Sequence, residues 1–328
     1  MDTSDTTSAA SNYRNSTYTQ STVLLFSSIN DVKTFGQCVD FMHDTHCQSS
    51  YDSDDDVAAT SRRISVFRQS KDKPQANVVL GEYLLSELEL FRKTYIILHT
   101  HLVDCAKHLE KLHNKYVKKF LKSLNAASSS SHNANFDLMV TIACETTING
   151  VLFAKIWSSI VKLNCERDQT LNVKCLKLAS HLKLESSVDE FGPLCADYFK
   201  VERAHFAINT KSILRELKRL PFLNNPHEKL ECIKTSVDLM NNELSVASKK
   251  KDTSVQLTSD LLIPLMAFVL LKSNIDCFKS IEFFLDNFQF SMSPDSYSKS
   301  HMSTMLAELS FFLTTFKAAV QLIEASHV

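Results

Sequence analysis

The residues best suited to metal chemistry lie near the N-terminus, where two cysteines and two histidines fall close together. They are Cys38, His43, His46 and Cys47. Thiolates and imidazoles are the ligands that zinc prefers, but the spacing C-x4-H-x2-H-C fits no common structural zinc site. A helix over this stretch would not bring all four side chains to one point. We therefore expect no metal site and no bound cofactor.

Other residues that could carry covalent chemistry are poorly spaced. Four histidines lie within residues 99–113, but none forms an i, i+4 pair and the H-E-x-x-H motif is absent. The nine cysteines form no C-x-x-C pair, which is typical of free thiols in the reducing cytosol. With only four glycines, the chain cannot form a glycine-rich phosphate loop of either common type. We expect no covalent chemistry and no nucleotide site built by this chain alone.

One acid stands out because of the helix predicted to follow it. The segment begins with Thr258, Ser259 and Asp260 and continues as an apolar run to Leu271. A Thr or Ser hydroxyl can cap a helix by accepting from its free N–H groups, and the helix dipole favours a carboxylate in the first turn. A helix that is apolar on every face is buried. We therefore expect Asp260 at the exposed tip of a rigid buried helix, which by local rules alone is an ordinary helix-start acid.

The scarcity of glycine and proline limits the fold. The 328 residues include four glycines and six prolines, whereas average usage would supply about 23 glycines. Sandwiches and barrels need turn glycines at short intervals, so an all-α fold is expected. The net charge of −1 produces no global field toward nucleic acid or an anionic membrane. The longest uncharged apolar run, 261–271, is too short to span a bilayer, so no transmembrane segment is predicted.

Four regions are predicted along the chain. Residues 1–75 are rich in Ser, Thr, Asp and Asn and are expected to be mostly disordered; their acidic run, 51–56, is either a solvated linker or a phosphorylatable interaction segment. Residues 82–125 are expected to form one long amphipathic helix. A helical bundle over 132–226 and a helical core over 226–328 should follow. Within them, helical stretches are expected to begin at about 136 and 152, and further helices are expected at about 168–183, 186–199, 200–218, 227–244, 258–272, 276–287 and 302–325.

The helix expected over 82–125 carries a heptad seam. Apolar or ring residues recur in alternating steps of four and three from Leu84 to Tyr116. Such a seam packs inside a bundle or joins two chains as a coiled coil, so self-association through 84–116 is one of two open interpretations. Several lysines are expected to form a solvated face, with a membrane or partner contact as the alternative. They are Lys111, Lys115, Lys118, Lys119 and Lys122.

Several motifs in the C-terminal part together resemble a known family. Its first pattern, D-D-L-L-P followed by K-x-N, is matched by Asp260, Pro264, Lys272 and Asn274. Its last pattern is matched by Thr314, Ala318, Ala319 and Ile323, while 281–288 and 226–233 fit two further helical patterns. The chain thus resembles the vacuolar-protein-sorting-nine (VPS-nine) domain family over about 226–325, and more weakly back to about 135. The likeness is closest to the exchange domain of the ankyrin-repeat member, although this chain has no ankyrin repeats.

The resemblance implies a fold, an activity and a set of residues. Members are guanine nucleotide exchange factors for Rab-five-type GTPases of early endosomes, with an all-α layered domain behind a helical bundle. A cytoplasmic protein peripheral to early endosomes is therefore expected. By this resemblance the catalytic residues are Asp260 as an acidic finger, Phe311 and Thr314, and the partner-binding residues are Leu261, Pro264 and Asn274.

Two departures from the family pattern leave two functions open. Leu261 replaces the usual second acid, and Phe311 replaces a tyrosine, which removes a hydroxyl worth about two- to tenfold in rate. The first hypothesis is an exchange factor for Rab-five or Rab-twenty-one. The second is an exchange-impaired helical adaptor that binds Rab GTPases.

Overall fold

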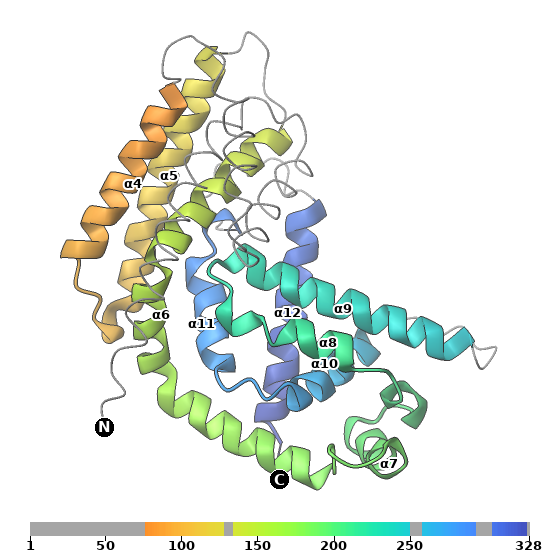
Figure 1. Ribbon diagram of the computed structural model, residues 1–328. Coiled ribbons are helices and arrows are strands. Elements are labelled where there is room, and N and C mark those ends of the chain that lie inside the picture. Colours follow the sequence, from red (N-terminus) through yellow and green to blue (C-terminus); the bar gives the residue numbers. More distant parts are fainter. Residues whose placement is uncertain (1–75, 128–133, 250–257, 293–303, 327–328) are drawn as a thin grey trace, which may run out of the picture. The chain divides into compact units, whose positions relative to one another are not determined.

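The computed structural model describes residues 76–127, 134–249, 258–292 and 304–326 (Figure 1). These residues form nine α-helices and four short 3-10 helices and contain no strand, so the all-α prediction is confirmed. The predicted disorder of 1–75, the acidic run and the cysteine and histidine set at 38–47 lie outside the described residues. The chain divides into two compact units, each of which is treated by itself below.

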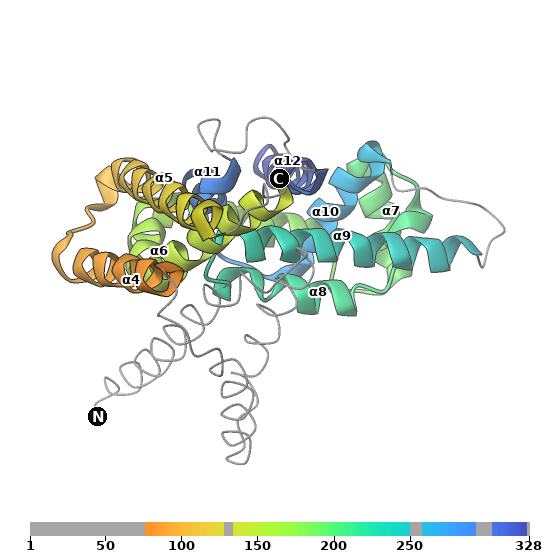
Figure 2. The same cartoon turned by 90° about the horizontal axis from the view of Figure 1, so that it is seen from above.

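The first unit contains a helical hairpin. Helix α4 (Ala76–Thr94) lies beside α5 (Leu102–Ala127), as Figures 1 and 2 show from two sides. The Lys115 ammonium contacts both carboxylate oxygens of Glu87 at 2.9 Å, and the Tyr116 hydroxyl donates to Glu87 at 2.8 Å. A buried His113 ring nitrogen lies 3.0 Å from the carbonyl oxygen of Thr141, on α6 (Ala134–His181). These polar contacts fix how the three helical segments of this unit pack.

The prediction of one continuous helix over 82–125 is wrong. Residues 95–98 lie outside any helix, and the short 3-10 helix η1 (His99–His101) separates α4 from α5. The break contains two adjacent β-branched isoleucines, which are weaker helix formers, and it allows the seam to fold back on itself. The rings of Phe91 and His108 then stack with centroids 5.7 Å apart. A heptad pattern alone does not distinguish one long helix from two antiparallel ones.

The side chains of the heptad seam therefore pack within a single chain. They are buried in both helices, so self-association through 84–116 would require this packing to open. The buried seam residues are Leu84, Leu88, Phe91, Leu102, Cys105, Leu109, Leu112 and Tyr116.

The second unit holds the C-terminal helices. Helix α12 packs along α10 and against α9, while α8 packs on α9 and α10 (Figure 1). Most expected helices are observed with small shifts at their ends. Two expectations need correction: 200–218 is interrupted between η2 (Arg203–Phe206) and α8, and the three helical stretches expected between 136 and 183 form the single helix α6. The helices of this unit are α7 (Val188–Phe199), α8 (Lys211–Leu217), α9 (Pro226–Lys249), α10 (Ser259–Ser273), α11 (Phe278–Phe288) and α12 (Thr304–Glu324).

Helix α12 is the only helix of the described residues that is long and apolar enough to cross a membrane, over Leu306–Glu324. Length and composition alone are weak support, because the core helix of a soluble protein can be equally long and apolar. Here one face of α12 is fully buried in the core that it shares with α10 and α11. We interpret α12 as a core helix. Its buried apolar residues include Leu309, Phe312, Phe316, Val320 and Ile323.

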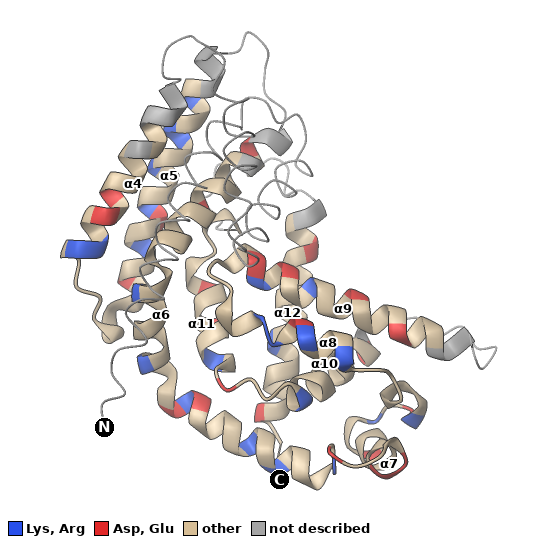
Figure 3. Ribbon diagram, in the orientation of Figure 1, with Lys and Arg blue, Asp and Glu red and all other residues tan. Residues whose placement is uncertain are grey.

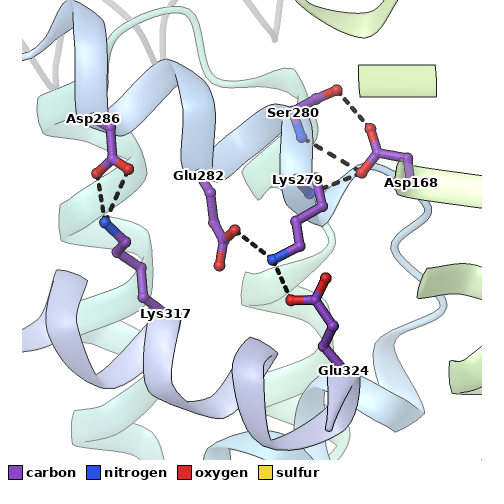
Figure 4. A network of polar contacts seen from close by, with 7 residues as sticks. All are labelled: Asp168, Lys279, Ser280, Glu282, Asp286, Lys317 and Glu324. Carbon is purple, nitrogen blue, oxygen red and sulfur yellow. Dashed lines mark hydrogen bonds and ion pairs between the residues drawn. The ribbon is translucent and has the colours of Figure 1, made fainter. Parts of the chain in front are cut away.

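A side chain from α6 caps the start of α11 (Figure 4). Asp168 accepts the Lys279 N–H at 2.7 Å and the Ser280 hydroxyl at 2.6 Å, whereas Cys277, at the N-cap position, makes no side-chain capping bond. The Lys279 ammonium continues the network to Glu282 at 2.9 Å and to Glu324 of α12 at 2.7 Å. One buried carboxylate thus joins α6 to the helices that carry the core.

We expect Asp168→Ala to lower the free energy of unfolding by about 2–3 kcal/mol, because a helix cap is lost and buried donors lose their acceptor. Denaturant unfolding of both proteins measures the difference. Asp197→Ala is the matched control, since Asp197 is an exposed acid of α7, and it should change stability by less than about 0.5 kcal/mol. Equal stability of the two variants would contradict the capping role.

A second buried charge lies on α9. The Lys229 ammonium is 4.8 Å from the ring centroid of Trp157 and 5.7 Å from that of Phe284, and it donates to the carbonyl of Leu220. The residue is fully buried. Loss of hydration disfavours the charged form, and burial lowers the pKa of Lys229 to about 8.

This pKa makes stability depend on pH. Between about pH 8 and the ordinary lysine pKa of 10.5, the unfolded chain binds more protons at this site than the folded chain. The free energy of unfolding therefore rises with pH in that window, by at most about 3 kcal/mol. Lys229→Met removes this term, so the stability of the variant relative to wild type should be highest below pH 8 and fall toward pH 10.5. Denaturant unfolding of wild type and Lys229→Met across this pH range tests the prediction. A difference in the free energy of unfolding that does not change with pH would contradict it.

Candidate functional site

The first turn of α10 is exposed and carries the predicted acid. Thr258 has extended backbone angles, φ −80° and ψ 162°, and its carbonyl accepts the N–H groups of Leu261 at 3.1 Å and Leu262 at 2.9 Å. Its hydroxyl makes no capping hydrogen bond, which corrects the expectation for this side chain. Asp260 is exposed, and no hydrogen bond or ion pair joins it to another of the described residues. Its carboxylate is thus available to a partner.

The remainder of α10 is packed on nearly every side. Residues 265–270 are almost completely buried, as expected for an apolar helix. Leu261 is only 7% exposed, which argues against the direct partner contact predicted for it and assigns its side chain to the core. Pro264 is half-buried and has no N–H, so the carbonyl of Asp260 lacks its i+4 helical donor. The acid therefore sits on a turn that is less tightly bonded than the rigid helix behind it.

Two other motif residues, Lys272 and Asn274, lie at the C-terminal end of α10. The Lys272 ammonium lies over the rings of Phe191 at 4.7 Å and Phe268 at 5.3 Å, and burial lowers its pKa. Asn274 ends the helix in the left-handed region, with φ 54°, where asparagine is tolerated better than most residues. These contacts give Lys272 and Asn274 structural roles. The partner contact predicted for Asn274, which is exposed, stays a prediction.

Helix α12 supplies the other two predicted catalytic residues. Phe311 is 47% exposed, and its ring centroid lies 5.5 Å from that of the buried Phe312. Thr314 is exposed and donates its hydroxyl to the carbonyl of Ser310 at 2.9 Å. The two side chains lie one turn apart on the outer face, whereas Phe312 and its neighbours face the core.

These two residues belong to a longer row that we term the uncharged α12 face. At helical spacing, exposed or half-exposed side chains without charge recur along the helix, and at 100° per residue its charged residues Glu308, Lys317 and Glu324 fall outside this row. Figure 3 marks the charged residues of the helix by colour. The sequence already shows uncharged residues at steps of three and four along this helix. Without knowledge of burial, such a pattern predicts a side that faces the core. The face consists of Ala307, Ser310, Phe311, Thr314, Ala318 and Gln321.

The site therefore combines an acid and an uncharged surface on two neighbouring helices. Helix α10 packs along α12, so the two helices that carry the predicted catalytic residues are neighbours. No group of three or more His, Cys, Asp or Glu side chains able to hold a metal occurs among residues 76–127, 134–249, 258–292 and 304–326. The arrangement, with one exposed carboxylate and an uncharged surface, suits recognition of a partner better than covalent chemistry.

Comparison with protein families defines this part of the chain. Residues 210–327 match the Vacuolar sorting protein 9 (VPS9) domain. The VPS9 match begins at the start of α8 and continues through α12, so it includes a helix that lies before the strong motif resemblance at 226–325. A VPS9 domain implies guanine nucleotide exchange activity toward Rab GTPases in general. No curated protein matches this chain.

Proposed function

We propose that this protein is an exchange factor that releases GDP from a Rab-five-type or Rab-twenty-one-type GTPase, with Asp260 as its acidic finger. One observation carries the proposal: the carboxylate of Asp260 is exposed on the first turn of an otherwise buried helix, within the segment that matches the VPS9 domain. No covalent step is involved, because exchange requires only that GDP and its magnesium ion leave.

The physical basis of release is electrostatic. In a GTPase a backbone loop, a lysine and Mg²⁺ hold the phosphates of the nucleotide. A carboxylate inserted there pairs with the lysine and repels the phosphates, so bound GDP and the inserted acid compete for the same positive charges. Asp260 suits this role because no partner in the described part of the chain must release it first.

The uncharged α12 face would support the partner beside the finger. An exposed aromatic ring surrounded by small and polar side chains is typical of an interface centre, whereas charged residues are depleted there. Phe311 provides the ring, and Ala307 and Ala318 allow the partner to approach closely. In this proposal the GTPase contacts Phe311 and Thr314 while Asp260 reaches its nucleotide site.

The finer parts of the assignment follow from the motif resemblance. The likeness to the exchange domain of Varp, the ankyrin-repeat member, supports an endosomal Rab as substrate and a cytoplasmic location peripheral to early endosomes. It also supports 226–328 as the exchange core and 132–226 as its supporting bundle.

A specific observation favours the second candidate function, an adaptor that binds a Rab without exchange. The second acid of the family pattern is absent, and Leu261 in its place is buried, so only one carboxylate is presented at the tip of α10. An adaptor would still use the uncharged α12 face.

Binding to different nucleotide states separates the two functions. By linkage, a protein that weakens GDP binding must itself bind more weakly when GDP is present, by the same factor. We expect the chain to bind a nucleotide-free Rab at least about 100-fold more tightly than the GDP-loaded Rab in calorimetry. Equal affinity for both states would contradict exchange and favour the adaptor.

Restoring the missing hydroxyl should improve exchange. Phe311→Tyr is expected to raise the rate of GDP release about two- to tenfold, the worth of one neutral hydrogen bond. Release of a fluorescent GDP analogue measures the rate. Phe222→Tyr is the control, because Phe222 is 74% exposed on η3 (Leu220–Phe222) and lies on neither α10 nor α12. If Phe311→Tyr does not exceed this control, position 311 does not face the nucleotide-binding partner.

A further inference from the structure

The connection between α4 and α5 exposes several apolar side chains to solvent. Ile96 is 79% exposed and Leu98 is 54% exposed, and neither lies in a helix. Leu90, near the end of α4, and Val103, in the first turn of α5, are 61% and 44% exposed. A single exposed apolar residue is ordinary, whereas several within a short stretch of chain mark a site of contact. We term these four residues the apolar connection.

The base of this connection is held in place. The Tyr95 ring stacks on that of Phe91 with centroids 4.3 Å apart, and Phe91 stacks on His108 of α5 at 5.7 Å. Further along the chain, the His101 N–H donates to the carbonyl of Leu98 at 2.9 Å. Figures 1 and 2 show the connection as the turn that joins α4 to α5. Because its ends are fixed, a contact made by its side chains costs little conformational entropy.

The charges of the connection do not oppose a negatively charged surface. Residues 90–103 contain no Asp or Glu. The two acids that flank this stretch each lie beside a basic side chain: Glu89 is 2.9 Å from Arg92, and Asp104 is 3.2 Å from a ring nitrogen of His101. The exposed aliphatic side chains are therefore the main feature of this surface, and no carboxylate interrupts them.

The size of the apolar connection favours a lipid surface over a protein partner. A stable protein interface uses about 20–30 residues on each side and matches the shape of its partner. The apolar connection offers four side chains on a short turn. Acyl chains adapt to the shape of what enters them, so a few aliphatic side chains are sufficient for a shallow contact with a bilayer.

We propose that the apolar connection inserts into the interfacial layer of an anionic lipid bilayer. The insertion is shallow, about 5–10 Å, because the backbone groups of 95–98 lie outside any helix and need hydration. Tyr95 supplies a ring of the kind that is enriched at this depth, and the exposed Lys93 can reach lipid headgroups. Each aliphatic side chain that leaves water strengthens binding about tenfold.

The first test is sedimentation of the full chain with phosphatidylcholine vesicles that contain 30% phosphatidylserine. Wild type should bind, and part of its affinity should persist at high salt, because salt screens charge but not apolar burial. The double variant Ile96→Ser, Leu98→Ser should lose about 100-fold in affinity. The matched control is Val173→Ser, Leu176→Ser, which truncates two α6 side chains that are 52% and 66% exposed and should leave the affinity within about twofold of wild type.

A fluorescent probe measures insertion without removing the apolar surface. Ile96→Trp places an indole on the connection, and wild type, whose single tryptophan is Trp157, supplies the background. Without vesicles, acrylamide should quench the new indole. With vesicles, its emission should shift to the blue and be quenched by lipids brominated on their acyl chains, while the Trp157 signal of wild type should not change.

Several results would overturn the proposal. They are failure of wild type to bind, equal binding by the two double variants, and emission of bound Ile96→Trp that brominated lipids do not quench. Shielding of Ile96→Trp from acrylamide before vesicles are added would show that another part of the chain, or a second copy, covers the connection. Circular dichroism should show unchanged helix content in every variant, because all of these positions are exposed. No GTPase is present, so failure here is distinct from failure of nucleotide exchange.

Discussion

Asp260→Ala is expected to slow the GDP release stimulated by this protein about 1,000-fold. Two unit charges 4 Å apart interact by about 4 kcal/mol at an effective dielectric constant of 20. If most of this attraction between Asp260 and the GTPase lysine lowers the barrier to GDP release, losing it slows release by roughly three orders of magnitude. Stopped-flow release of a fluorescent GDP analogue measures the change.

The control for this variant is another exposed acid of the same unit. Asp238 lies on α9, and Asp238→Ala changes the net charge by the same amount. Asp238→Ala should change the rate of GDP release by less than about twofold, because salt screens a charge that lies outside the contact with the GTPase. Both variants should unfold at the same denaturant concentration as wild type. Undiminished release with folded Asp260→Ala would show that another group expels the nucleotide.

Phe316→Ala is expected to be the most destabilising single truncation in α12, at about 3–5 kcal/mol. The side chain is fully buried, and its ring meets that of Phe278 edge-on with centroids 6.2 Å apart. Removing it leaves a cavity between α12 and α11 that the packed core cannot close. Denaturant unfolding measures the loss.

Phe311→Ala is the matched control, because the same residue type is removed from the opposite face of the same helix. Phe311 is 47% exposed, so we expect a stability change below about 1 kcal/mol together with slower GDP release. The pair thus separates stability from function. Similar destabilisation by both variants would contradict the two-faced structure of α12.

The sequence was sufficient for the part of the site that depends on local rules. An apolar run preceded by Thr, Ser and Asp predicts a buried helix with an exposed acid, and α10 has this form. The end of the helix was also predictable, because Asn274 tolerates the left-handed conformation that the structure shows. Such features depend on residues within one or two turns of each other.

Features that depend on distant packing were not predictable in this way. The heptad seam had the same period whether 82–125 formed one helix or the α4 and α5 hairpin, and only the contacts of Glu87 and Phe91 decide between them. Asp168 gave no local signal of its role, because the N–H groups that it caps lie on another helix. Leu261 occupies an acidic motif position, and only its burial shows that it belongs to the core.

The uncharged α12 face could be predicted only in part from the sequence. Its residues recur at helical spacing, but so do the buried residues of the same helix, and α12 is long and apolar enough to cross a membrane. The resemblance selected Phe311 and Thr314 as contacts. Their exposure, together with that of Ser310 and Gln321, shows that the selected face is directed outward.

The central claim is that this protein releases GDP from a Rab GTPase, and one measurement tests it most directly. Purified full-length chain is added to a panel of Rab proteins loaded with a fluorescent GDP analogue, with excess unlabelled nucleotide and magnesium present. The account predicts faster release from Rab-five or Rab-twenty-one, increasing with the concentration of the chain. Release that stays at the intrinsic rate for every Rab, while chelation of magnesium still empties each of them, would contradict it.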